Sequence, residues 1–78
     1  MTADQYFERA EPLARKERES FTRVKNAVMQ FHIDCVLALK RREPEPKPSR
    51  LLGSVAEHQQ VLTELTALNE AFLSQGGN

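Results

Sequence analysis

The chain has 78 residues, of which 40% are hydrophobic and 28% charged, and its eleven Lys and Arg balance its eleven Asp and Glu. A chain of this length forms one small domain, whose single core seldom supplies more than about 3–5 kcal/mol without further stabilisation. One cysteine, Cys35, excludes an internal disulfide, and no apolar run approaches the roughly 18 residues that cross a membrane. We therefore expect a cytoplasmic protein that gains stability by association.

The charges are distributed unevenly along the chain. Residues 1–50 hold all eleven basic and eight of the acidic residues, a net charge of +3. Residues 51–78 hold Glu57, Glu64 and Glu70 and no basic residue, a net charge of −3. This division favours antiparallel pairing of the second part of the chain with the first.

A long helix is predicted from about residue 3 to residue 42. Thr2 and Gln5 match a capping box at its start, and apolar residues then recur at intervals of four and three, which is typical of a helix facing a core. The expected core stripe, interrupted only by a glutamate, is Ala3, Phe7, Ala10, Ala14, Glu17, Phe21, Val24, Val28, Phe31, Cys35 and Ala38, widened by Tyr6, Leu13, Ala27 and Val36.

Pro12 predicts a break in this helix, because proline removes a backbone donor and disfavours helical geometry in the preceding residue. The alternatives are a kink, or a short helix over about residues 3–10 followed by a longer one. At the other end, Lys40, Arg41 and Arg42 suit the negative end of the helix dipole.

A connector is predicted over residues 43–53. Pro44, Pro46 and Pro48 cannot continue a helix and favour extended polyproline II. Because these prolines are two residues apart, they form no P-x-x-P motif. We therefore interpret the segment as a connector and not as a docking peptide. A second helix is expected over about residues 54–75, with Ser54 and Glu57 as its capping box and with an apolar face formed by Val55, His58, Val61, Leu62, Leu65, Leu68 and Phe72.

Together these elements predict a single all-α domain, residues 1–78, built as an antiparallel helical hairpin. If the chain reverses at residue 46, the numbers of facing residues sum to about 92. Glu57 would then lie near residue 35, within reach of Lys40 or Arg41 if the register slips by one turn, and the second helix would be too short to cover the start of the first. Two helices cannot bury so wide a stripe, so we expect a homodimer that forms a four-helix bundle of coiled-coil type.

The function expected from this architecture is a non-enzymatic one. A small adaptor, chaperone-like, inhibitory or other regulatory protein would present a helical surface to another protein, through the residues left uncovered near the N-terminus: Tyr6, Phe7, Arg9, Ala10 and Leu13. No nucleophile with an adjacent base and no glycine-rich phosphate loop appears in the sequence. We expect no cofactor and no membrane partner.

Two weaker patterns offer alternative sites. RNA or DNA could bind the basic segment 15–25, which contains Arg15, Lys16, Arg18, Arg23 and Lys25, but Glu17 and Glu19 interrupt it. Zinc could bind His32 and Cys35, which are one helical turn apart, if His58 also approached. Strong zinc sites have four ligands in paired spacings, so we expect Cys35 to pack as a small hydrophobe and no metal to bind.

Overall fold

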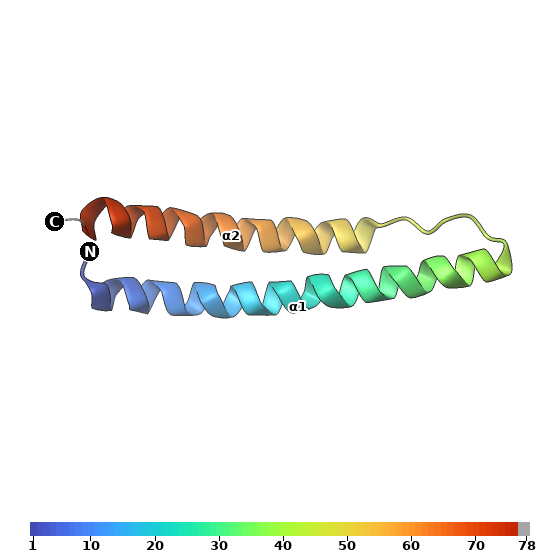
Figure 1. The fold of residues 1–78 in the computed structure, drawn as a ribbon, viewed down its shortest axis with the longest axis horizontal. Coiled ribbons are helices and arrows are strands. Elements are labelled where there is room, and N and C mark those ends of the chain that lie inside the picture. The colour runs from blue at the N-terminus through green and yellow to red at the C-terminus, as the bar shows by residue number, and fades with distance from the viewer. Residues whose placement is uncertain (77–78) are drawn as a thin grey trace.

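The computed structural model, which describes residues 1–76, consists of two helices, α1 (Ala3–Arg41) and α2 (Ser49–Gly76). They pack side by side and antiparallel, with the start of α1 and the end of α2 at one end of a rod and the connector at the other (Figure 1). The rod measures 62 × 16 × 13 Å. The predicted all-α hairpin is therefore confirmed. Neither of the two helices, as described, has a stretch apolar and long enough to span a membrane.

The N-terminus of α1 is the predicted capping box. The Gln5 amide donates to Thr2 Oγ1 at 3.2 Å, and the Thr2 amide donates to Gln5 Oε1 at 2.9 Å. The helix continues through Pro12, so the alternative of a separate short helix over residues 3–10 is wrong. Pro12 is exposed, and so is Glu8, whose carbonyl loses its usual helical partner and can bind water instead.

At its other end α1 stops at a left-handed residue, Arg42, with φ 55° and ψ 40°. The Glu43 amide donates to the Ala38 carbonyl at 2.9 Å, and the Arg42 amide donates to the Leu39 carbonyl at 3.3 Å. These two bonds form a Schellman motif, which satisfies carbonyls at the helix end. The motif reverses the direction of the chain, so the connector runs back along α1 (Figure 1).

The second helix begins at Ser49, before the predicted start at Ser54, which shortens the connector to residues 43–48. The Pro48 carbonyl accepts the first helical bond, from the Leu52 amide, at 2.9 Å. Ser54 is not a cap: its hydroxyl donates to the carbonyl one turn earlier in the same helix, at 3.0 Å.

The early start of α2 has a packing reason. It brings Leu51 beside Ala27 and Phe31 of α1, where Leu51 is half-buried. Half-burial of a leucine side chain contributes about 0.75–1.5 kcal/mol, which offsets the roughly 0.5–1 kcal/mol cost of holding Gly53 inside a helix.

The connector also sets which residues of the helices face each other. Six extended residues rise about 19 Å at 3.1 Å each, the length of about twelve helical residues at 1.5 Å each. Facing residue numbers therefore sum to about 78 instead of 92, as Ser20 with His58 and Tyr6 with Phe72 show. The predicted uncovered arm is wrong, because α2 extends to the start of α1, where the Met1 amine donates to Gln75.

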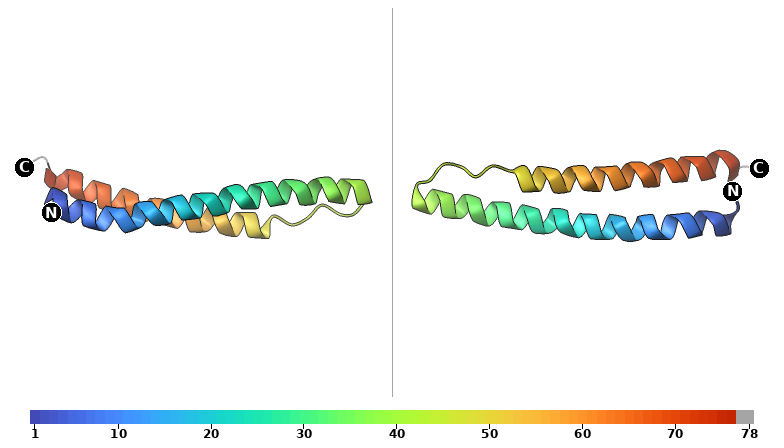
Figure 2. Two further views of the ribbon diagram at one scale, coloured as in Figure 1. Left: turned by 90° about the horizontal axis from the view of Figure 1, so that it is seen from below. Right: turned by 180° about the vertical axis from the view of Figure 1, so that it is seen from behind.

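The seam between the helices follows two heptad series of buried and half-buried residues. The series in α1 is Tyr6, Ala10, Leu13, Glu17, Ser20, Val24, Ala27, Phe31, Asp34 and Ala38, and that in α2 is Leu51, Ser54, His58, Val61, Leu65, Leu68 and Phe72. Steps of three and four are the pattern of a left-handed coiled coil. Consistently, the two helices cross at a shallow angle in the left view of Figure 2.

The core enclosed by this seam is thin. Of the described residues, only Ser20, Ala27 and Val61 are buried. The accessible surface of the chain is 6156 Å², against about 4,800 Å² for a compact protein of its mass. A hairpin of this kind covers little of its own apolar surface.

Candidate interaction surface

Eleven large hydrophobic side chains are exposed among the described residues. They fall into two groups, one along a side of the seam and one on the outside of α1. We name the first the apolar flank and include the smaller residues that continue it: Phe7, Ala14, Phe21, Val28, Cys35 and Leu39 of α1, with Leu52, Val55, Leu62 and Leu73 of α2. The second, the distal ridge, is Met29, Ile33, Val36 and Leu37.

A seven-residue repeat places the apolar flank on one side of the rod. In α1 the flank residues from Phe7 to Cys35 recur every seven positions, and each follows a seam residue directly, so in a coiled coil they share one side. In α2, Val55 and Leu62 follow seam residues in the same way. The ring of Phe21 lies 5.6 Å from that of His58, which links the two helices on this side.

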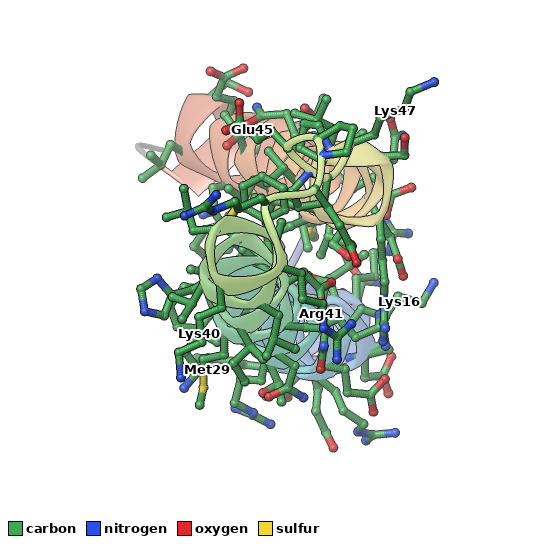
Figure 3. All side chains as sticks on the ribbon, turned by 90° about the vertical axis from the view of Figure 1, so that its right-hand side faces the viewer. Lys16, Met29, Lys40, Arg41, Glu45 and Lys47 are labelled. Atoms are coloured by element: carbon green, nitrogen blue, oxygen red, sulfur yellow. The ribbon has the colours of Figure 1, made fainter. Side chains whose placement is uncertain are left out.

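The opposite side of the seam is polar. Arg23 of α1 forms an ion pair with Glu57 of α2 there, which replaces the predicted contact of Glu57 with Lys40 or Arg41. Seen along the rod from the connector end, Lys16 and Arg41 lie on one side, which Lys47 shares (Figure 3). Several charged side chains therefore line this side of the rod, although Lys25 also lies near Phe21 of the apolar flank.

At the terminal end, an aromatic cluster supports the flank. The ring of Tyr6 stacks on that of Phe72 with centroids 4.6 Å apart, and meets the ring of Phe7 edge-on at 5.5 Å. The Tyr6 hydroxyl donates to Asn69 Oδ1. Tyr6 is thereby held against α2, while Phe7 remains 66% exposed.

The distal ridge occupies the outer face of α1 near the connector. Its residues have the i, i+4, i+7, i+8 spacing of one helical face, and Figure 3 shows Met29 on the side of α1 away from α2. Met29 is 64% exposed. Between residues 20 and 42 the only acidic residue is Asp34, which is half-buried in the seam and accepts a hydrogen bond from Gln30 Nε2 at 2.9 Å. The charges around the ridge are therefore positive.

The residues predicted to bind a partner do not all share one surface. Tyr6, Ala10 and Leu13 are half-buried along the seam, whereas Phe7 and Arg9 are exposed. A shallow depression is lined by Tyr6, Ala10 and Phe7, but by neither Leu13 nor Arg9. Their role in binding stays a prediction, now with Phe7 and Arg9 as the exposed members.

The residues predicted to bind nucleic acid are distributed around α1. Arg15 pairs with Glu11 at 3.1 Å, and Arg23 is held by Glu57 across the seam. Lys25 Nζ lies 5.2 Å from the centroid of the Phe21 ring. Lys16 and Arg18 are exposed. Two of these five cations thus neutralise neighbouring carboxylates, and no single positive face results.

The three possible zinc ligands do not meet. His58 lies opposite Ser20, about three helical turns from His32, because the helices pack in a different register from the predicted one. Within residues 1–76 no three His, Cys, Asp or Glu side chains are grouped so that they could hold a metal. Cys35 is half-buried and lines a depression with Ala38, Leu39, Glu43 and Glu45.

Sequence reasoning missed both the distal ridge and the true course of the seam. The ridge could have been found from the stretch 28–39, where apolar residues occupy almost every side of the helix. The seam of α2 could have been extended backward, because Leu51, His58, Leu65 and Phe72 are spaced by seven. No family model, curated protein or solved structure matches the chain.

Proposed function

We propose that the chain is a non-enzymatic protein–protein interaction module that works as a homodimer, in which two hairpins form a four-helix bundle. The observation that carries this proposal is the apolar flank, which follows the rod along its length and is exposed in the single chain. The chain exposes roughly 1,300 Å² more surface than a compact protein of its mass, whereas one partner contributes about 800 Å² to a standard interface. A second hairpin is large enough to cover the flank.

The distal ridge is the surface proposed for a different protein. Met29, Ile33 and Val36 lie on the outer face of α1, away from both the seam and the flank, and Leu37 borders the seam on the side opposite the flank, so a dimer formed through the flank leaves all four accessible. Lys25 and Lys40 stand near the two ends of the ridge, which favours a partner whose apolar contact residues are bordered by acidic ones. An adaptor, chaperone-like or inhibitory role follows from such a surface.

A photo-crosslinking amino acid at position 33 tests the ridge directly in cells of the native host. The same amino acid at position 19, two heptads earlier in the same row of α1, is the matched control. We expect position 33 to capture a distinct protein that position 19 does not capture. We also expect Leu37→Asp to abolish that capture without reducing helicity measured by circular dichroism.

Two results would refute the ridge as the partner surface. One is capture of the same proteins, in the same amounts, from positions 19 and 33. The other is capture at position 33 that Leu37→Asp leaves unchanged, since a charge in the middle of an apolar contact must weaken it.

A further inference from the structure

We propose that the second copy lies antiparallel to the first, so that the chain ends of one hairpin are beside the connector of the other, with the two-fold axis passing near Phe21. This inference rests on the homodimer proposed above and selects between its two symmetric forms. When two rods pack through the same flank, the axis runs either along the rods, which puts like ends together, or across them, which puts opposite ends together.

Charge is the first argument for opposite ends. The connector half of the rod, residues 21–57, holds seven basic and four acidic residues, a net charge of +3. The terminal half, residues 1–20 and 58–78, holds four basic and seven acidic residues, a net charge of −3. Like ends together would place equal charges side by side, whereas the antiparallel form places each half against its opposite.

The shapes of the flank residues provide a second argument. The row of α1 that forms the flank is symmetric about Phe21, because residues 7 and 35, and 14 and 28, are equally distant from it. In the antiparallel form Phe7 of one copy faces Cys35 of the other, and Ala14 faces Val28. Phe7 and Val28 of one copy then each meet a smaller side chain of the other, as interdigitated packing requires, and the two Phe21 rings meet at the axis.

The surface around Cys35 fits this arrangement. Cys35, Ala38 and Leu39 line a depression beside the connector, and Phe7 is the most exposed ring of the flank. The antiparallel form directs the Phe7 ring of one copy toward that depression in the other. It also brings Leu62 of one α2 opposite Leu52 of the other. Arg18 and Lys25 approach each other between copies only at the solvent-exposed rim, where their long side chains can diverge.

The native Cys35 provides a sharp test. In the variant Phe7→Cys, mild oxidation of the full chain should link position 7 of one copy to Cys35 of the other, identified by mass spectrometry of the digested dimer. Ala14→Cys is the control, because position 14 faces position 28, about 10 Å along the helix from Cys35, and should not form this link. The unmodified chain should form no Cys35–Cys35 disulfide, since the antiparallel form separates the two thiols by about 42 Å.

A distance measurement covers the case in which Phe7→Cys weakens the dimer. Spin labels on the variant Gln5→Cys with Cys35→Ala should lie about 48 Å apart in the antiparallel form, and close together if like ends meet. A short label distance, or a Cys35–Cys35 link in the unmodified chain, would overturn the arrangement while leaving the homodimer intact. A monomeric mass in sedimentation would overturn both.

Discussion

Ser20 is the most buried residue of the hairpin, and it is polar. Its side chain is 0% exposed, and its hydroxyl donates to the Glu17 carbonyl at 3.0 Å. Ser20 Oγ also hydrogen-bonds His58 Nδ1 across the seam, at 2.7 Å. One polar layer of this kind in an otherwise apolar seam favours a single register of the two helices.

The contribution of this layer can be measured with Ser20→Ala. The substitution leaves His58 Nδ1 without its hydrogen-bond partner in a half-buried seam, which should lower the free energy of unfolding by about 1 kcal/mol. Urea unfolding followed by circular dichroism at one fixed protein concentration checks this, since association also contributes to stability.

Ser74→Ala is the matched control for that experiment. Ser74 makes the same kind of bond within its helix, to the Ala71 carbonyl at 3.0 Å, but is exposed and has no hydrogen bond across the seam. Both substitutions change helix propensity equally. Equal stabilities of the two variants would show that the contact of Ser20 with His58 contributes nothing.

At the residue scale, the sequence predicted one of the two seam rows of α1, which contains Val24 and Phe31, and was wrong about the other. Hydrophobicity favours the row that contains Phe7, Phe21 and Val28, whereas the seam uses the neighbouring row, which contains Ser20 and Asp34. Polar residues are tolerated there because they find partners, and the partner of Ser20 is 38 positions away in the chain. A periodicity rule applied to one helix at a time cannot detect such a pair.

At the scale of the elements, the course of the connector and the start of α2 determine which residues of the two helices face each other. The sequence predicted an extended, proline-rich connector and two helices, and the structure has both. It missed the course of the connector, because the left-handed Arg42 turns the chain back along α1, and this reversal shifts every facing pair. Neither proline spacing nor charge contains that information.

Gly53 tests the start of α2. It lies inside the helix, its φ is not positive, and a Cβ built on it would meet no atom within 4 Å. Gly53→Ala should therefore raise the free energy of unfolding by about 0.5–1 kcal/mol, by lowering the entropy of the unfolded chain. Thermal unfolding followed by circular dichroism measures it.

The reverse substitution one turn later, Ala56→Gly, is the control and should lower stability by a similar amount. If α2 instead began with Ser54 as its cap, Gly53 would precede the helix. In that case Gly53→Ala would leave the free energy of unfolding unchanged. This result would show that the start at Ser49 is wrong.

At the scale of the whole molecule, the fold is an elongated rod with a thin core. The radius of gyration is 18.2 Å, against about 11.5 Å for a compact domain of 78 residues. A rod that is two helices thick can bury only the residues between them, so part of the wide apolar stripe in the sequence stays exposed in the single chain, and association stays a prediction. Which sides stay exposed depends on the register of the helices, and this required the structure.

Sedimentation equilibrium over a range of concentrations tests the central claim most directly, since it reports whether the apolar flank is covered by a second copy. We predict a mass of twice 8.9 kDa for the unmodified chain, and dissociation on Phe21→Asp, which places a charge at the proposed axis. The control Thr22→Asp, on the outer face of α1, should remain dimeric. A folded monomer of 8.9 kDa at every concentration would contradict the account.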